Sequence, residues 1–317
     1  MSVSSVETAE EVSNIAFGFM ASKAMFAGLH LDVFTHLAAG PKTCENLSEI
    51  VGVPANRIIT LMNALNGVGL VELNGNLYAN SLGAEAFLSR ETKYDFLDGS
   101  LSSDAVDSYQ HWMSNPEQAA LYSNAQHSGS LGPGRTIARM VDLTGAKSLL
   151  DVAGGTGAMT IRLLEANPDL TSTIIDFPNV SEIGWRFITE ANMTNRVRYI
   201  PSNALNVEWP SEQDAILMSY LFSGVPGEEV PRLVQYAFDS LVPGGKFLVH
   251  DFMVNDDRTG PVLAALWQLQ HMAFTPDAHS VTAGWLKAEM KKVGFIDIQD
   301  IQVIQGLTQL VHARKPE

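Results

Sequence analysis

The sequence has 317 residues, of which 46% are hydrophobic and 17% charged, a balance typical of a folded globular protein with room for two domains. The formal net charge of -15 and the scattered Lys and Arg residues disfavour a nucleic-acid partner, because phosphate backbones bind concentrated positive charge. A single cysteine, Cys44, excludes an internal disulfide and a multi-cysteine metal site. With an acidic N-terminus and no apolar run of roughly 18 residues, we expect a cytoplasmic protein that neither spans a membrane nor is exported and that binds small molecules.

Residues 1–92 are predicted to form a helical domain. Apolar residues surround the predicted helix from Ala16 to Leu37 on nearly every side, so we expect it to be buried against a second subunit in a homodimer. Two short helices begin near Thr43 and Pro54, and a hairpin turns at Asn74-Gly75, which is the order of a winged helix. Since the second of these helices carries only one cation, Arg57, we interpret the domain as a dimerisation module, with a DNA-binding regulator as the alternative.

Residues 93–143 are predicted to be a helical bridge and active-site cover with aromatic side chains, broken by a glycine-rich loop at 126–134. From Lys147 onward, short apolar strands alternate with helical stretches. This alternation predicts, over residues 144–317, an α/β domain of the Rossmann-like, doubly wound kind with helices on both faces of a parallel sheet. Ligands of such sheets bind beyond the carboxyl ends of the strands, so the loops there are the expected site.

The most informative motif is LLDVAGGTGAMTIRLL, a strand that ends at Asp151 and is followed by a glycine turn and a helix. Glycines at 154, 155 and 157 permit a tight turn that approaches a ligand closely, and the helix start presents free N–H groups. The third glycine of a dinucleotide motif is replaced by Thr160, which weakens the case for NAD. The next strand ends at Asp176, whose carboxylate can accept from ribose hydroxyls of either NAD or an adenosyl ligand.

Together with IIDFP, LVPGGKFLVHDFM and the winged helix, this motif resembles the dimeric S-adenosylmethionine-dependent O-methyltransferase family of plants and bacteria over almost the whole chain. The resemblance implies that S-adenosylmethionine binds and that S-adenosylhomocysteine is released. It also implies which residues contact each part of the cofactor. Around the methionine part these are Asp151, Gly154, Gly155 and Gly157, and at the ribose Asp176. At the adenine they are Phe177, Asn203 and Ala204, and at the sulfonium Ser219 and Tyr220. Two positions depart from the family pattern, because Ala153 replaces a glycine and Asn203 a common aspartate, whose role an amide oxygen can still fill.

A larger departure concerns catalysis. Most of the family carries His-Asp where this chain has Phe222 and Ser223, neither of which is a base at neutral pH. Without a general base a hydroxyl acceptor loses about 10²- to 10⁴-fold in rate. A thioether needs no base, so we predict S-methylation of a small anionic thioether, similar to the methylthiohydroxybutyrate S-methyltransferases of dimethylsulfoniopropionate synthesis. The alternatives are C- or O-methylation of an aromatic or polyketide acceptor, and a chain that binds the cofactor without donating methyl, as a non-methylating enzyme or an inactive protein.

The acceptor is expected to contact aromatic and histidine side chains around the predicted cavity, since an anion needs cationic or donor groups. The candidates are Tyr122, His127, Phe222, Trp267, His271 and His279. His250 and Asp251 are adjacent on a strand and point to opposite faces, so no metal site is expected.

Overall fold

The computed structural model describes residue 7, residues 9–90, 109–257 and 277–317, and positions 261, 264, 267, 268, 271 and 275. The side chains of residues 8–18 and 20 are outside this description. The chain divides into two compact units, Met1–Leu97 and Asp98–Glu317, each of which is described by itself.

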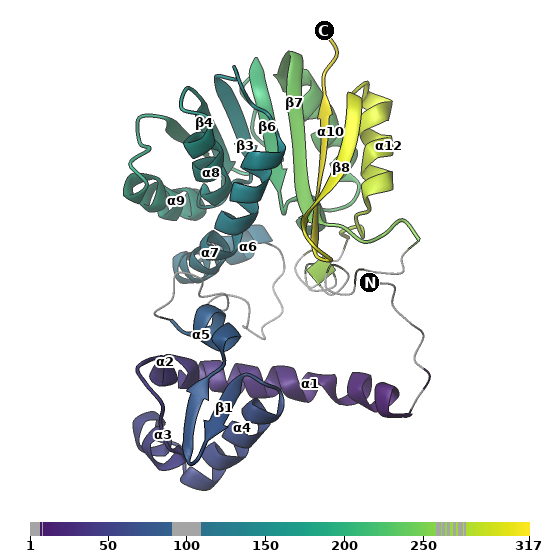
Figure 1. Ribbon diagram of the computed structural model, residues 1–317. Helices are drawn as coiled ribbons and strands as arrows, with labels where there is room; N and C mark the ends of the chain where they lie inside the picture. The colour runs from purple at the N-terminus through teal and green to yellow at the C-terminus, as the bar shows by residue number, and fades with distance from the viewer. Residues whose placement is uncertain are drawn as a thin grey trace. The chain divides into compact units, whose positions relative to one another are not determined.

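The first unit is a small helical domain with one hairpin. Its elements are α1 (Ala9–His30), α2 (Val33–Ala38), α3 (Cys44–Val51), α4 (Ala55–Gly67), β1 (Val71–Asn74), β2 (Leu77–Asn80) and α5 (Leu82–Leu88). Thr43 caps α3 by accepting from the N–H of Asn46, as expected for a threonine at a helix start. The predicted order of two short helices and a hairpin is confirmed (Figure 1).

The prediction of one apolar helix from Ala16 to Leu37 is wrong beyond His30, where α1 ends and a separate helix, α2, follows. The helix is interrupted because Asp32 adopts a left-handed conformation with φ of 55°, and the carboxylate of Asp32 pairs with Arg90 at 2.6 Å. The last turns of α1 pack inside their own unit, where Met25 and Leu29 contact the core around Phe34. This end of the helix is therefore stabilised within one subunit, whereas Phe19, further back along α1, is 53% exposed.

The second unit contains a seven-stranded sheet in the order β5-β4-β3-β6-β7-β9-β8. Its strands are β3 (Ser148–Val152), β4 (Thr171–Asp176), β5 (Val197–Pro201), β6 (Gln213–Ser219), β7 (Leu241–Phe252), β8 (Ile296–Ile304) and β9 (Thr308–Arg314). β3 to β7 are parallel, as predicted, and β8 and β9 add an antiparallel edge. Strand order reverses between β3 and β6, and a crevice at such a switch point is where these sheets bind ligands.

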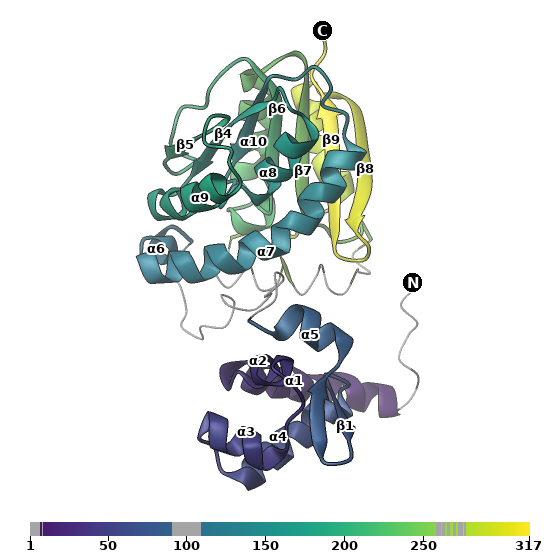
Figure 2. The ribbon, with the colours of Figure 1, turned by 60° about the vertical axis from the view of Figure 1, so that its left-hand side comes forward.

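Helices cover both faces of this sheet. They are α6 (Tyr109–Met113), α7 (Pro116–Met140), α8 (Ala158–Ala166), α9 (Pro178–Glu190), α10 (Glu229–Ser240) and α12 (Ala283–Val293), together with the short 3-10 helix η1 (Phe222–Gly224). Figures 1 and 2 show α8 and α9 on one face and α10 and α12 on the other. Alternate residues of the central strands divide accordingly, since Leu149 and Leu217 pack toward α8 while Leu150 and Ile216 pack toward α10.

The predicted glycine-rich loop at 126–134 is wrong, because these residues lie inside α7. Gly134 serves close helix packing: a Cβ there would lie 3.2 Å from Met159 and Arg162 of α8. From the sequence alone, a glycine that allows two helices to pack closely cannot be distinguished from a glycine that allows a turn. The consequence for the site is that His127 is held on a rigid helix.

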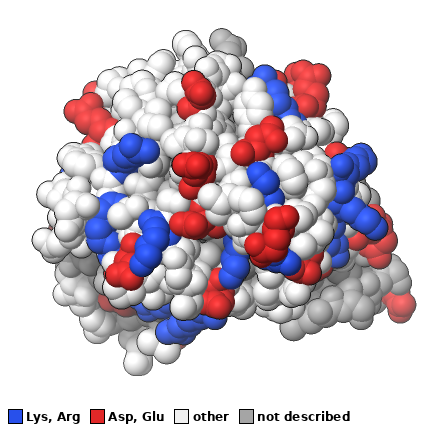
Figure 3. All heavy atoms as spheres, turned by 90° about the horizontal axis from the view of Figure 1, so that it is seen from above, with Lys and Arg blue, Asp and Glu red and all other residues white. Residues whose placement is uncertain are grey.

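Charged side chains are mixed on the face of the molecule seen in Figure 3, where Lys and Arg alternate with Asp and Glu and form no continuous basic area. Among the described residues, no helix has the length and apolar character required to cross a membrane.

Candidate functional site

A cavity of about 430 Å³ lies in the second unit at the carboxyl ends of β3, β4 and β6. This volume is in the range of small-molecule sites. Its lining has two parts. The glycine-loop end contains Asp151, Gly154, Gly155, Asp176 and Phe177, and the aromatic end contains Tyr109, Tyr122, Tyr220 and Leu221.

The glycine-loop end begins with Asp151, which is fully buried at the end of β3. One oxygen of its carboxylate accepts from the hydroxyl of Thr160 at 2.7 Å, and the other has no hydrogen-bond partner. Burial raises the pKa of Asp151 to about 7, because a desolvated charge is unfavourable. Thr160 therefore holds the Asp151 carboxylate in place, a role that the sequence motif did not indicate. The Asp151 oxygen without a partner is available to a cationic group of a ligand.

Glycine is required in the turn itself for two different reasons. A Cβ on Gly154 would lie 2.5 Å from the Asp151 carboxyl carbon, and Gly157 has φ of 76° with buried isoleucine side chains around it. Ala153 also has a left-handed φ, 56°, a conformation that costs an alanine roughly 1–2 kcal/mol. The alanine substitution noted in the sequence is thus accommodated with strain.

Asp176 fixes the glycine turn from the neighbouring strand. Its two carboxylate oxygens accept from the N–H groups of Gly155 and Phe177, each at 2.7 Å. Burial raises its pKa to about 6, although these two N–H donors oppose the shift. Each oxygen keeps a further lone pair for a ligand hydroxyl.

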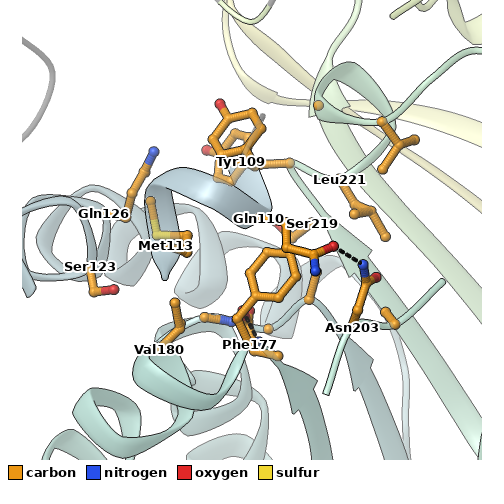
Figure 4. A pocket seen from close by; sticks show the side chains of 18 of the residues that line it. Tyr109, Gln110, Met113, Ser123, Gln126, Phe177, Val180, Asn203, Ser219 and Leu221 are labelled. Carbon is orange, nitrogen blue, oxygen red and sulfur yellow. Dashed lines mark hydrogen bonds between the residues drawn. The ribbon is translucent and has the colours of Figure 1, made fainter. Parts of the chain in front are cut away.

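The Phe177 ring projects into the cavity beside an amide pair that joins two distant segments (Figure 4). The amide nitrogen of Asn203, in the loop after β5, donates to the side-chain oxygen of Gln110 on α6 at 2.9 Å. The Asn203 oxygen accepts from the N–H of Leu205. Ala204 also lines the cavity. Sequence reasoning did not find Gln110, because nothing in α6 indicates that it reaches the loop after β5.

Ser219 and Tyr220 line the middle of the cavity at the end of β6. The Ser219 hydroxyl is 2.9 Å from Nδ1 of the buried His250, and Tyr220, with φ of 57°, packs edge-on to the same ring. Burial lowers the pKa of His250 to about 3, so this imidazole is neutral. His250 is thus a buried neutral residue that positions the Ser219 hydroxyl.

At the aromatic end, Tyr109 and Tyr122 meet edge-to-face with ring centroids 6.1 Å apart. Burial raises the pKa of both phenols, most strongly that of Tyr109, so both are protonated at neutral pH. Tyr122 was a predicted acceptor residue, and Tyr109 was noted in the sequence only as part of an aromatic segment. Both project from the helical segment 93–143 that was predicted to cover the site.

Phe222 lies away from the cavity lining. It is fully buried in the core between the sheet and α10, so it does not border the space where an acceptor would lie. Ser223 is also buried, and its hydroxyl donates to the Asp251 carboxylate at 2.6 Å.

The remaining predicted acceptor residues also lie outside the cavity lining. His127 stacks on Phe187 and bonds Thr156; its pKa is lowered to about 4 by burial and by the nearby charges of Arg162 and Arg186. His279 packs against Gly227 and Trp285. Trp267 stacks on Phe252, and His271 is buried behind Tyr109.

Cationic side chains are missing from the described lining of the cavity, which contains three carboxylates, those of Asp151, Asp176 and Asp277. Across the described part of the chain, no three His, Cys, Asp or Glu side chains are grouped so that they could hold a metal ion.

The model of the O-methyltransferase domain matches residues 92–295, and that of the O-methyltransferase dimerisation domain matches residues 13–90. The chain belongs to the O-methyltransferase family. Its fold and this membership make it an S-adenosylmethionine-dependent methyltransferase with an N-terminal dimerisation domain.

Two curated relatives agree with this assignment, and a solved structure agrees with the fold. The 3-hydroxy-5-methyl-1-naphthoate 3-O-methyltransferase of Streptomyces sahachiroi is 25% identical and covers 83% of both chains. The L-tyrosine C(3)-methyltransferase of Streptomyces lavendulae is 26% identical, covering 69% of this chain and 63% of that protein. The crystal structure of human N-acetylserotonin methyltransferase in complex with SAM matches with a TM-score of 0.84 at 19% identity, covering 99% of this chain and 100% of that one.

Proposed function

We propose that the chain transfers a methyl group from S-adenosylmethionine to a hydroxyl group or ring carbon of a small, uncharged aromatic acceptor. The observation that carries this proposal is the composition of the cavity, which joins two buried carboxylates and a glycine turn to a set of tyrosines. The described lining offers no cation to an anionic acceptor.

The glycine-loop end fits the cofactor. The partnerless oxygen of Asp151 suits the ammonium of the methionine part, and Asp176 suits the ribose hydroxyls. Phe177, Asn203 and Ala204 border the place of the adenine. Bound there, the cofactor supplies an electrophilic methyl group on a sulfonium, which we place near Ser219 and Tyr220.

The aromatic end suits a flat, mainly apolar acceptor. Tyr109 and Tyr122 present ring edges and protonated phenols, which contact aromatic rings favourably and donate hydrogen bonds without carrying charge. The printed names of two relatives, a naphthoate O-methyltransferase and a tyrosine C-methyltransferase, support an aromatic acceptor. We extend the aromatic ring to this chain but not the carboxylate that both of those acceptors carry, because the described lining offers no cation.

The predicted S-methylation of an anionic thioether gains less support from this geometry. His127 and His271, which were to bind the anion, are neutral because burial lowers their pKa values to about 4. Asp277 adds negative charge to the same cavity. The burial of Phe222 favours neither acceptor, because this residue does not line the cavity.

The first unit is proposed to form the homodimer contact through α1 and neighbouring apolar side chains. Phe19, Leu82 and Phe87 are 53%, 91% and 52% exposed in the isolated chain. Large apolar side chains exposed in this way are covered in a stable subunit interface. Sedimentation at micromolar concentration should show a species of twice the 34.4 kDa chain mass.

Product analysis tests the function. The chain is incubated with methyl-labelled S-adenosylmethionine and, separately, with a hydroxynaphthoate ester, an N-acylated tyrosine amide and methylthiohydroxybutyrate. We expect the label in one of the two uncharged aromatic compounds. Label in the thioether alone would restore the S-methyltransferase prediction, and cofactor binding without label in any broader panel would favour a non-methylating role.

A further inference from the structure

Three buried polar side chains form a hydrogen-bonded chain behind the aromatic end. The hydroxyl of Ser223 donates to the carboxylate of Asp251 at 2.6 Å, and Nδ1 of His271 is 2.8 Å from the same hydroxyl oxygen. Their exposed fractions are 2% for Ser223, 0% for Asp251 and 4% for His271. These hydrogen bonds thus join η1 and β7 to His271, which follows both in the sequence and belongs to neither.

The hydrogen bonds fix where the protons lie. The Asp251 carboxylate also accepts from the N–H groups of Ser223 and Phe252, so it acts as an acceptor throughout. The Ser223 hydroxyl has one hydrogen, which it gives to Asp251, so its oxygen accepts from Nδ1–H of His271. Nε2 of His271 then carries the free lone pair, and no hydrogen bond to Nε2 is recorded among the described residues.

His271 is adjacent to residues that line the aromatic end. Its ring meets that of Tyr109 edge-on, with centroids 6.3 Å apart. One turn along, the N–H of Thr275 donates to the His271 carbonyl, and the Thr275 hydroxyl donates to the carbonyl of Gly224. Tyr109, Thr275 and Gly224 all border the cavity. His271 therefore lies behind the part of the cavity wall that Tyr109 and Thr275 form, and proton transfer to Nε2 requires an acceptor hydroxyl that reaches between them.

We propose that His271, oriented by Ser223 and Asp251, is the catalytic base that replaces the histidine absent at Phe222. The inference rests on the proposed function, since it requires an acceptor with a hydroxyl proton. Ser223 and Asp251 are positioning residues: they hold the imidazole in the tautomer whose Nε2 can accept a proton, in the manner of serine-hydrolase triads.

The proton balance of the step is complete within these groups. The bond from the acceptor oxygen to the methyl carbon forms as the sulfonium carbon–sulfur bond breaks, and its electron pair stays on sulfur as a neutral thioether. The hydroxyl proton moves to Nε2 of His271. The negative charge of Asp251, which is hydrogen-bonded to the imidazole through Ser223, stabilises the resulting imidazolium until the proton passes to water.

The pH dependence follows from Asp251. Burial raises its pKa to about 6, so below that pH the carboxyl group is neutral and no longer stabilises an imidazolium through Ser223. Burial lowers the pKa of His271 to about 4, so the imidazole stays neutral. The other titratable groups near Asp251 are His250, Tyr109, Tyr122 and Tyr220. We expect turnover to fall as pH drops through about 6.

The kinetic test uses a phenol that the unaltered chain methylates. His271→Gln should lower kcat by about 10²- to 10⁴-fold with little change in the acceptor KM, and Ser223→Ala should lower it less. His312→Gln is the matched control, because His312 lies on β9 outside the cavity lining and should retain full activity. Cofactor affinity should be the same in all three variants, which shows that each is folded.

A His271→Gln variant that binds cofactor and keeps kcat within about twofold would overturn the inference and leave the proposed function intact. A chain that methylates no aromatic acceptor would instead end the proposed function and this inference with it, and a chain that methylates only ring carbons would end this inference alone. If His271→Gln does not fold, nitrogen NMR of histidine-labelled protein decides. We expect the His271 signal of a neutral ring protonated at Nδ1 at pH 7, and protonation at Nε2 would contradict the proposal.

Discussion

The two ends of the cavity are built from different kinds of groups. At the glycine-loop end, backbone groups and two buried carboxylates form the surface, and Asp176 fastens the turn by accepting from Gly155. At the aromatic end, residues of α6 and α7, together with Thr275, meet residues at the end of β6. Backbone surfaces tolerate few substitutions, whereas a surface of side chains from separate segments can change acceptor without loss of the fold. The predictions that follow test whether the two ends can be altered independently.

The largest expected difference between the ends concerns charge. Asp176→Asn should weaken cofactor binding by about 1–3 kcal/mol, because charged-acceptor hydrogen bonds to the ribose are lost. The matched variant Asp277→Asn removes a carboxylate at the border of the cavity and should leave cofactor affinity within about twofold. Calorimetry with S-adenosylmethionine measures both, and equal losses would contradict the division of the cavity into two ends.

The glycine turn should be sensitive to a single methyl group. Gly157→Ala should lower the free energy of unfolding by about 2 kcal/mol, since φ is 76° and the new Cβ would lie 2.8 Å from Cδ1 of Ile188. In Gly132→Ala on α7, the Cβ has nothing within 4 Å, so this control should gain up to about 1 kcal/mol. Denaturant unfolding distinguishes them, and similar stability of the two variants would refute a strained turn.

Cofactor affinity should depend on pH through Asp151. With a pKa of about 7, this carboxyl is mostly protonated at pH 6 and mostly ionised at pH 7.5, where the cofactor ammonium, of pKa about 7.7–8, is still largely charged. Affinity should therefore rise about fivefold from pH 6 to 7.5, and Asp176, with a pKa of about 6, acts in the same direction. Asp151→Asn should bind more weakly with a flatter profile. A wild-type affinity that falls over this range would count against the ammonium contact.

The smallest expected effect is a gain at Ala153. A glycine removes the left-handed strain of about 1–2 kcal/mol but adds about 0.4–1 kcal/mol of unfolded-state entropy, so Ala153→Gly should stabilise the chain by about 0.5 kcal/mol. A small rise in Tm at constant pH checks it. A clear fall in Tm would mean that the alanine methyl makes packing contacts that outweigh the strain.

The difference between the two ends also explains what could be predicted from the sequence. Asp151, Gly154, Gly155 and Asp176 lie within short local motifs, so their place in the cavity was predictable from order and spacing, whereas Gly157 of the same motif shapes the turn outside the cavity lining. Tyr122 was found because aromatic residues precede the sheet domain.

The other residues predicted to contact the acceptor lie outside the cavity lining, because tertiary packing determines their surroundings. His127 was expected in a loop, yet the glycines that suggested a loop allow α7 to approach α8. Because Phe222 stands where the family has a histidine, the sequence indicated that the chain has no catalytic base. No local sequence pattern shows that Ser223 bonds to Asp251 and His271. Such a contact depends on pairing residues 28 and 48 positions apart.

A crystal structure of the chain with S-adenosylhomocysteine and a phenolic acceptor tests the central assignment most directly. The account predicts the homocysteine ammonium on Asp151, the ribose on Asp176, and the sulfur beside Ser219 and Tyr220, with the acceptor ring against Tyr109 and Tyr122 and its hydroxyl directed toward Thr275. A nucleoside bound away from the glycine turn, or a sulfur directed away from the tyrosines, would contradict it.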